Sequence, residues 1–513
     1  MSIPSTTRPK IRFSSLFAKE WTQITLLLAP IGIAGAAFMG WLTPFGVGIY
    51  VDTLYYISSA RNLIAGIGFG RISGLGVFKP YISFPPLYSL VLAFFQLLGL
   101  PALSAARWIS IIAFGLSVIL VGLIVYQRTN SRSFSLFCSI LTLLSNPILH
   151  NFSWAMTEPL YIVLMLASLF LFASYFHTPL RRWLILTAIF ASLAFLTRFI
   201  GIALVGALCL ALILNRQIAW HRRMQDLAIF LSITLIPSAA WLVRNWLVSE
   251  NLTNRVLAWH PITSQNLELL IKAVNGWGVI PQRLMIGHET LAFAGIVVGF
   301  AVVGLTWLWR SFPRPGNAPT QEFTMLWASW IYVGVLGISL FFLDATIRLE
   351  NRILLPLYML ILILMVIASA LLWQRKSLLI RLAVLLICLW FAYFSFTRVD
   401  GAIIDLRSDG QGYASQRWQN SPTAAFIRQQ STSVIYTNDI TAIYFLTGKD
   451  SVGIPNENAT ESDLAQMRAN LSTPDSYLVI FGTLTGEFAP LEKLTSGLTL
   501  VSSFEDGKIY QLH

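Results

Sequence analysis

Charged residues are scarce in this 513-residue chain, where Asp, Glu, Lys and Arg together make up 11% of the sequence. Soluble domains carry roughly 25% charged residues. Hydrophobic residues make up 56% of the chain, which is more than a protein with a water-exposed surface needs for its core. The shortage of charge therefore excludes an ordinary soluble enzyme and predicts a polytopic membrane protein.

Cysteine is also scarce, and the three cysteines all lie within apolar runs, at Cys138, Cys209 and Cys388. We therefore expect no disulfide in an external domain and no thiolate metal site. The sequence also lacks a phosphate-binding loop of the Walker type and a Gly-x-Gly-x-x-Gly motif after a strand. These absences argue against ATP-driven transport and against a cytoplasmic nucleotide-sugar site.

The few charges are mostly positive and give a formal net charge of +12. No basic patch interleaved with exposed aromatic residues occurs, so we expect no nucleic-acid partner. Lys and Arg instead hold loops on the cytoplasmic side of a membrane. Segment 1–23 is basic and precedes the first long apolar run, 24–43. We predict a cytoplasmic N-terminus, followed by an uncleaved signal anchor.

One of the apolar runs, 84–99, is short for a bilayer, which needs about 20 helical residues. If this run spans, the basic loops that follow it all move outside, against the positive-inside rule. We therefore predict a juxtamembrane or re-entrant helix there, within a first external loop at 44–101. The remaining runs predict about eleven spans, at 24–43, 102–126, 134–149, 159–176, 183–199, 200–214, 226–247, 290–309, 323–343, 353–373 and 378–397.

Hydropathy falls sharply after residue 396, and 398–513 is predicted to be a small extracytoplasmic α/β cap domain. Buried strands are expected at 434–436 and 477–481, and a terminal strand pair at 498–504 and 509–512. The sequence thus predicts a mainly α-helical, multi-pass protein of the plasma (inner) membrane. Its membrane domain covers 24–397, and its C-terminus lies outside.

The predicted topology places several charged residues at the outer ends of spans. They are Asp52, Glu158, Arg198, Arg348 and Arg352. Singly, they can be explained as helix caps, a snorkelling side chain and an interfacial salt bridge. Charge at the mouth of apolar helices is nevertheless costly unless it is paired or used. We therefore predict that these residues share a site on the outer face.

Several short motifs lie around these residues and along the same part of the chain. They are Asp52-Thr53-Leu54-Tyr55-Tyr56, Ala60-Arg61-Asn62-Leu63, Phe84-Pro85-Pro86-Leu87-Tyr88, Ala106-Arg107-Trp108-Ile109-Ser110, Thr157-Glu158-Pro159-Leu160, Leu196-Thr197-Arg198 and Arg352-Ile353-Leu354-Leu355-Pro356-Leu357. In this order the motifs resemble the GT-C glycosyltransferase superfamily. The resemblance is to its polyprenyl-phosphate-sugar-dependent branch, which includes protein O-mannosyltransferases and lipid A aminoarabinose transferases, and it covers about the first two-thirds of the chain.

The resemblance implies a GT-C fold and a reaction on the extracytoplasmic face. A sugar passes from a polyprenyl-phosphate donor in the membrane lipid to an acceptor hydroxyl, with inversion at the anomeric carbon. The acceptor is a glycan, a lipid or a protein. Asp52 is the implied general base, and Glu158 and Tyr55 orient the acceptor. The implied ligands of the donor phosphate are Arg198, Arg348, Arg352 and Lys79.

A divalent metal ion and a different function remain open at this point. Thr53 stands where many members of the superfamily have a second acid beside the first, so one hard ligand fewer is available. Asp52 and His260 are the candidate metal ligands. The competing function is a transporter or flippase of lipid-linked glycans. Transporters commonly contain internal repeats and midplane polar groups, and this sequence shows no such repeat.

Overall fold

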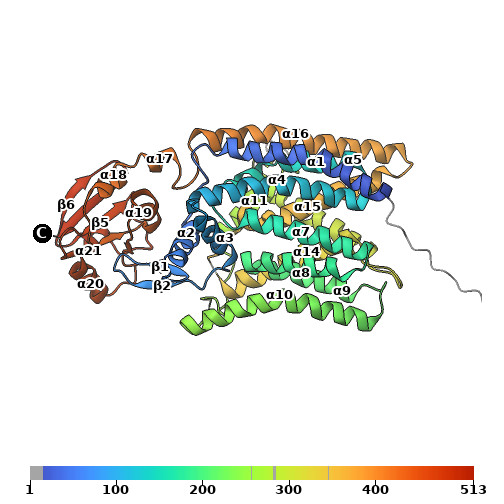
Figure 1. The fold of residues 1–513 in the computed structure, drawn as a ribbon. Coiled ribbons are helices and arrows are strands. Elements are labelled where there is room, and N and C mark those ends of the chain that lie inside the picture. The colour runs from blue at the N-terminus through green and yellow to red at the C-terminus, as the bar shows by residue number, and fades with distance from the viewer. Residues whose placement is uncertain (1–14, 256, 281–284, 345, 513) are drawn as a thin grey trace, which may run out of the picture.

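The computed structural model describes residues 15–255, 257–280, 285–344 and 346–512. They form a bundle of long helices with a smaller, sheet-containing part at one end (Figure 1). The bundle consists of α1 (Ser15–Leu42), α4 (Ala102–Thr129), α5 (Arg132–Leu143), α6 (Asn146–Phe152), α7 (Glu158–His177), α8 (Arg181–Thr197), η1 (Phe199–Gly201), α9 (Ile202–Ile213), α10 (Trp220–Ser249), α11 (Ser264–Asn275), α13 (Glu289–Arg310), α14 (Gln321–Ile338), η2 (Ser339–Leu343), α15 (Asn351–Trp373) and α16 (Leu378–Ser408).

Eight helices in the described ranges are long and apolar enough to cross a membrane, which makes the chain a multi-pass membrane protein. The expected number of eleven is not confirmed. The run at 134–149 is the pair α5 and α6, bent by 56°, and counting this pair as one span gives nine. The run at 183–199 corresponds to α8, which has 17 residues, and the run at 200–214 corresponds to α9, which has 12. Both helices are shorter than the roughly 20 residues that a bilayer requires.

Segment 84–99 is not among the candidate spans. It forms α3 (Leu87–Leu97), whose 11 residues extend about 16 Å, roughly half of a hydrocarbon core. Helix α3 packs against α2 (Val51–Ile64) at the end of the bundle (Figure 1). This arrangement agrees with the prediction that 84–99 does not span.

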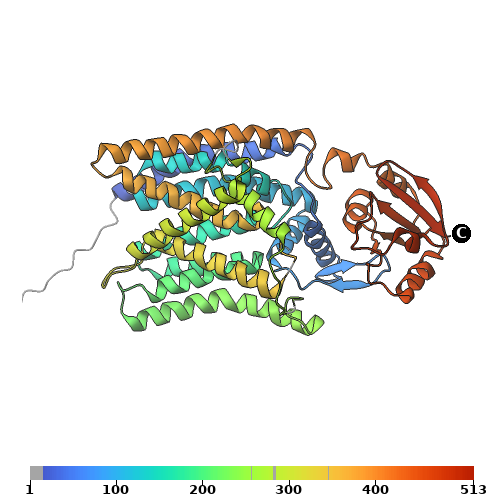
Figure 2. The same cartoon turned by 180° about the vertical axis from the view of Figure 1, so that it is seen from behind.

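The first loop continues from α2 into a hairpin of β1 (Gly70–Ile72) and β2 (Phe78–Pro80). Seen from behind, this hairpin reaches from the bundle to the sheet-containing part (Figure 2). Buried side chains from α2, α3 and the start of α4 form an apolar core of their own, which Tyr444 of the C-terminal part joins. The loop is therefore a packed layer between the two parts of the molecule.

The C-terminal part contains five strands and several short helices. The elements are α17 (Gln416–Gln419), α18 (Pro422–Gln429), β3 (Ile435–Thr437), α19 (Ile440–Thr447), β4 (Val452–Gly453), α20 (Glu461–Leu471), β5 (Tyr477–Phe481), α21 (Leu491–Thr495), β6 (Leu498–Ser503) and β7 (Gly507–Leu512). The strands form a mixed sheet in the order β4-β3-β5-β7-β6. Strand β3 is parallel to β4 and β5, while the β5–β7 and β7–β6 pairs are antiparallel.

Helix α16 continues past the expected boundary at 397, to Ser408. The division at 398 and the extracytoplasmic place of this part stay predictions.

Helices α1 and α4 approach closely because glycines face each other at their crossing. A Cβ atom added to Gly115 would lie 2.6 Å from the carbonyl oxygen of Gly32. Gly115→Val is therefore expected to destabilise the protein by about 1–3 kcal/mol, the usual effect of overpacking. Gly299→Val on α13 is the matched control, because no atom lies within 4 Å of its added Cβ. Melting curves of the two purified variants test this, and equal melting temperatures would contradict it.

Candidate active site

Helix α2 carries Asp52 in its first turn, and Thr53 holds that turn in place. The buried Thr53 hydroxyl accepts a hydrogen bond from the Tyr50 backbone N–H (3.0 Å) and donates one to the Ala155 carbonyl (3.1 Å). The hydroxyl thereby provides an acceptor for the Tyr50 N–H, a donor at the helix start that would otherwise lack a partner. Thr53 thus connects α2 to the segment before α7.

Four charged side chains form one continuous network, although they come from four separate regions of the chain. The Asp52 carboxylate contacts Arg352 at 2.7 Å, and the Arg352 Nε atom lies 3.1 Å from Glu158. Glu158 also pairs with Arg198, which in addition donates a hydrogen bond to the Thr157 hydroxyl (3.1 Å). We call Asp52, Arg352, Glu158 and Arg198 the Asp52–Arg198 network. Two carboxylates and two guanidinium groups balance their charges within it.

The two ends of this network differ in burial. The Glu158 side chain is only 1% exposed and that of Arg198 14%, whereas Asp52 and Arg352 are 18% and 30% exposed. Charges buried this deeply persist only when they are paired, because the desolvation penalty is several kcal/mol per ion. Glu158 and Arg198 thus form the buried end of the network, and Asp52 and Arg352 form its more exposed end.

A cavity of about 350 Å³ lies at the more exposed end, and we call it the Arg352 cavity. This volume is within the usual range of small-molecule sites. The Arg352 guanidinium stands over the ring of Tyr50, 5.3 Å from its centroid. The cavity is lined by Tyr50, His150, Asn151, Trp154, Met156, Leu269, Lys272, Ala273, Glu350, Asn351 and Arg352.

Sequence reasoning missed most of the cavity wall. His150 and Trp154 come from α6 and the segment after it, and Lys272 from α11. None of these residues belongs to a motif with a recognisable spacing, and α11 has the polar and apolar pattern of an ordinary amphipathic helix. Only the packing of α6, α11 and α15 brings them together.

Tyr55 lies one turn beyond Asp52 on α2. Its ring packs against Tyr81 and Phe84, with centroid distances of 4.5 and 5.2 Å. Burial, and secondarily the Asp52 carboxylate, raise the pKa of the Tyr55 phenol. The group therefore stays protonated at neutral pH and can donate a hydrogen bond beside Asp52. This position is compatible with the predicted orienting role.

Lys79 and Arg348, two of the predicted phosphate ligands, do not contact the network. Lys79 lies on β2, opposite Arg71 of β1, in the hairpin that faces the C-terminal part. Arg348 pairs with Glu350 at 2.7 Å and is 53% exposed. Among the described contacts, neither side chain reaches Asp52 or Glu158. Only Arg198 and Arg352 of the four predicted ligands belong to the network.

The residues present do not fit a divalent metal ion. No group of three or more His, Cys, Asp and Glu side chains suited to a metal occurs in the described part of the chain. Both carboxylates of the network already pair with arginine, whereas a divalent ion would need them as hard oxygen ligands. The backbone of His260, the other candidate ligand, is bonded to Phe341, and no contact joins its imidazole to Asp52.

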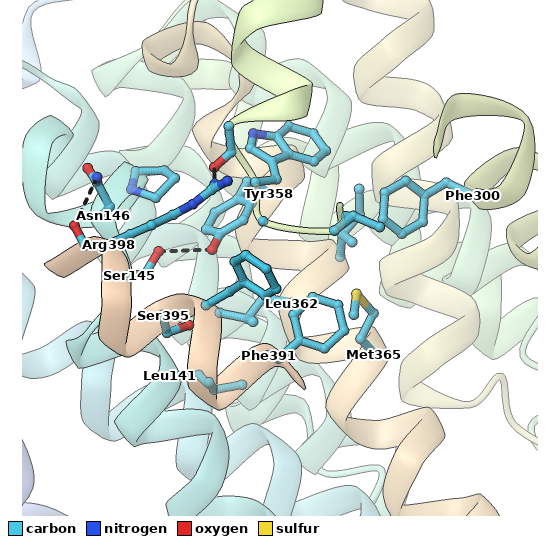
Figure 3. Close-up of a pocket in the computed structure, with 17 residues that line it drawn as sticks. Leu141, Ser145, Asn146, Phe300, Tyr358, Leu362, Met365, Phe391, Ser395 and Arg398 are labelled. Carbon is cyan, nitrogen blue, oxygen red and sulfur yellow. Dashed lines mark hydrogen bonds between the residues drawn. The ribbon is translucent and has the colours of Figure 1, made fainter. Parts of the chain in front are cut away.

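A second, smaller pocket lies between α5, α6, α11, α13, α15 and α16 (Figure 3). Its polar groups bond to one another. Ser145 pairs with Tyr358 at 2.9 Å, Asn146 donates to the Arg398 carbonyl (3.3 Å), and Arg398 donates to the Gly276 carbonyl. Arg398 thus anchors the end of α11 to α16. Because Lys272 of α11 lines the Arg352 cavity, this anchor supports the cavity wall.

Comparison with known proteins gives one partial family match and several similar folds. Residues 80–253 match the sequence model of the dolichyl-phosphate-mannose-protein mannosyltransferase family. This range contains Glu158 and Arg198 but neither Asp52 nor Arg352. No curated protein matches the sequence.

Several solved structures share the fold. ArnT from Cupriavidus metallidurans in the apo state superposes with a TM-score of 0.57 at 14% identity, covering 96% of this chain and 98% of that chain. The same protein bound to undecaprenyl phosphate gives 0.53 at 13%, with the same coverage. The archaeal oligosaccharyltransferase AglB from Archaeoglobus fulgidus, in complex with an inhibitory peptide and a dolichol-phosphate, gives 0.53 at 12%, covering 91% of this chain and 70% of that chain.

At these identities the structures establish a shared fold, and the family match adds a sequence relation over the middle of the bundle. The predicted resemblance is therefore confirmed: the chain matches the dolichyl-phosphate-mannose-protein mannosyltransferase family by sequence over residues 80–253 and shares the fold of ArnT and AglB over nearly its whole length.

Proposed function

We propose that the protein is a membrane glycosyltransferase that moves a sugar from a polyprenyl-phosphate donor to an acceptor hydroxyl in the Arg352 cavity. The observation that carries this proposal is the contact of a carboxylate, Asp52, with a guanidinium, Arg352, beside an open cavity. Support comes from the family match and from related folds bound to undecaprenyl phosphate and dolichol-phosphate.

The reaction takes place on the extracytoplasmic face in this proposal. The basic loops that follow α4, α7, α9, α13 and α15 lie at the end of the bundle opposite the first loop (Figure 1). Lys and Arg collect in cytoplasmic loops, so the network, the cavity and the C-terminal part belong to the other side. A polyprenyl phosphate in the outer leaflet would then present its sugar at the cavity.

Asp52 acts as the general base. In its ion pair with Arg352 it is a carboxylate, and it takes the proton of the acceptor hydroxyl. The acceptor oxygen attacks the anomeric carbon from the face opposite the phosphate, so a new C–O bond forms while the bond to the phosphate oxygen breaks. The electron pair of the broken bond leaves with the lipid phosphate, and the configuration inverts. A positioned base contributes about 10²–10⁴-fold to the rate.

Arg352 stabilises the leaving phosphate, because its guanidinium is the most exposed cation of the network. Fixed cations aimed at developing negative charge are usually the largest electrostatic contribution to catalysis. Lys272 lines the same cavity and supplies a second cation. Arg198 is turned toward Glu158, so it acts through that carboxylate. Arg348 and Lys79 lie outside the network, and we assign them only a long-range attraction of the donor phosphate.

Transfer by the purified protein from a panel of polyprenyl-phosphate sugars tests the proposal. We expect one donor to yield free polyprenyl phosphate and a glycosylated acceptor in equal amounts. The transporter alternative predicts the opposite pattern in proteoliposomes, in which a lipid-linked glycan changes leaflet while its sugar–phosphate bond stays intact. That pattern, with no product from any donor, would reject the glycosyltransferase.

A further inference from the structure

We infer that the turn Gln411–Tyr413, which joins α16 to the C-terminal part, positions the general base and shapes the Arg352 cavity. We call these three residues the junction turn. The inference rests on the proposed function in assigning the general base to Asp52. The contacts of the junction turn with α2 and with the cavity wall are independent of that assignment.

The junction turn packs directly against the residues that lead into α2. The backbone N–H of Tyr413 donates to the carbonyl of Ile49 (3.1 Å), which lies just before α2 begins. Gly412 has a φ of +55°, and an added Cβ there would lie 2.0 Å from that carbonyl oxygen and 2.7 Å from the Trp154 ring. Only glycine allows this approach, because it lacks a Cβ and tolerates positive φ.

The junction turn also contacts His150, which lines the Arg352 cavity. The side-chain amide N–H of Gln411 contacts the His150 ring nitrogen Nδ1 at 3.1 Å, and the Ser153 hydroxyl donates to the side-chain amide oxygen Oε1 of Gln411 (2.5 Å). Gly48 in turn accepts from Ala155 (2.9 Å) and donates to Ser153 (2.8 Å). The lead-in to α2 therefore lies between the junction turn and the 153–155 segment, with backbone bonds on both sides.

The C-terminal part also contacts the far end of α2. The Tyr413 hydroxyl donates to Asp439 (2.8 Å), and Asp439 caps α19 by accepting from Ala442 (2.9 Å). Tyr444 of α19 lies under the guanidinium of Arg61, near the end of α2, at 5.2 Å. One continuous set of contacts thus reaches both ends of the helix that carries Asp52. A displacement of about 1 Å at a reacting group can lower a rate about 10²-fold. The contacts that position α2 therefore affect the rate through the position of Asp52.

Gly412→Ala is the test, with Gly448→Ala as its matched control. Gly448 ends α19 at a φ of +75°, and no atom lies within 4 Å of an added Cβ. Both substitutions place a side chain at positive φ, but only Gly412→Ala collides with the lead-in to α2. We expect kcat per folded molecule to fall about 10²-fold in Gly412→Ala, with the donor KM little changed. Gly448→Ala keeps the wild-type kcat.

Gln411→Ala provides a second variant that introduces no clash. It loses the contacts with His150 and Ser153. We expect kcat to fall by about tenfold, less than in Gly412→Ala, because Asp52 is held less precisely. A role in folding alone would lower the melting temperature and leave kcat per folded molecule unchanged. That result in both variants would overturn the inference.

Hydrogen exchange measured by mass spectrometry tests the positioning without any enzyme assay. In Gly412→Ala and Gln411→Ala we expect faster amide exchange in peptides covering 47–56 and 150–156, and in Gly448→Ala the wild-type rates. Unchanged exchange in both junction-turn variants would reject the positioning even if the protein transfers no sugar. Faster exchange with an inactive wild type would instead reject the proposed function and retain the positioning.

Discussion

Replacing Asp52 by Asn is expected to lower the rate of sugar transfer by about 10²–10⁴-fold, the contribution of a positioned general base. The amide keeps the size of the carboxylate, and its oxygen can still accept from Arg352, which lies 2.7 Å from Asp52. The change therefore removes the proton acceptor and leaves the shape of the site. Initial rates with the donor identified in the transfer assay, measured at saturating acceptor, give the comparison.

Asp344→Asn is the matched control. Asp344 is 24% exposed, close to the 18% of Asp52, and pairs with a single arginine, Arg255, at 3.6 Å. The same chemical change at this position should leave the rate within a few-fold of the wild type. An Asp52→Asn enzyme that retains activity to within about threefold would show that another group takes the proton, because the loss would fall far short of general-base catalysis.

Replacing Glu158 by Gln is expected to remove activity and to destabilise the protein. Glu158 is the carboxylate that both Arg198 and Arg352 contact, and its side chain is 1% exposed. Without its charge, two guanidinium groups lie close together with only Asp52 to balance them. Breaking a buried ion pair by removing one partner costs about 3–5 kcal/mol. We expect a large fall in melting temperature, and loss of transfer because Arg352 is no longer held beside Asp52.

Glu322→Gln separates these two effects. Glu322 is 5% exposed and accepts two hydrogen bonds from Arg128, of 2.6 and 2.7 Å, away from the Asp52–Arg198 network. Its loss should lower the melting temperature while activity per folded molecule stays at the wild-type level. If Glu158→Gln and Glu322→Gln retain the same activity per folded molecule, Glu158 supports the fold and has no part in positioning Arg352.

Local patterns were sufficient for the membrane class and for the non-spanning first loop. Hydropathy and the placement of Lys and Arg depend on short windows of sequence and on the chemistry of lipid and water. The short run at 84–99 was accordingly recognised, and it forms the 11-residue helix α3. The predicted number of eleven spans is not confirmed, because hydropathy registers neither a bend, such as the 56° between α5 and α6, nor the early end of an apolar helix.

The candidate site was predicted only in part, for a different physical reason. Motif resemblance pointed to Asp52, Glu158, Arg198 and Arg352, which the fold joins in one network. It pointed equally to Arg348 and Lys79, which lie outside that network. An ion pair is decided by three-dimensional distance, and 300 positions separate Asp52 from Arg352. No local pattern shows which of several arginines closes such a gap.

By itself, the sequence determined that the chain is a membrane protein, because a chain with 11% charged residues has too few of them to cover the surface of a soluble protein of this size. It also determined which acids and arginines are out of place among apolar runs. The tertiary structure alone decided that Thr53 of α2 is hydrogen-bonded to Ala155 and that Arg352 lies between two carboxylates. It also decided that Gly412 packs against the carbonyl of Ile49. These features are contacts between distant segments, and only the packing of the helices against one another and against the C-terminal part creates them.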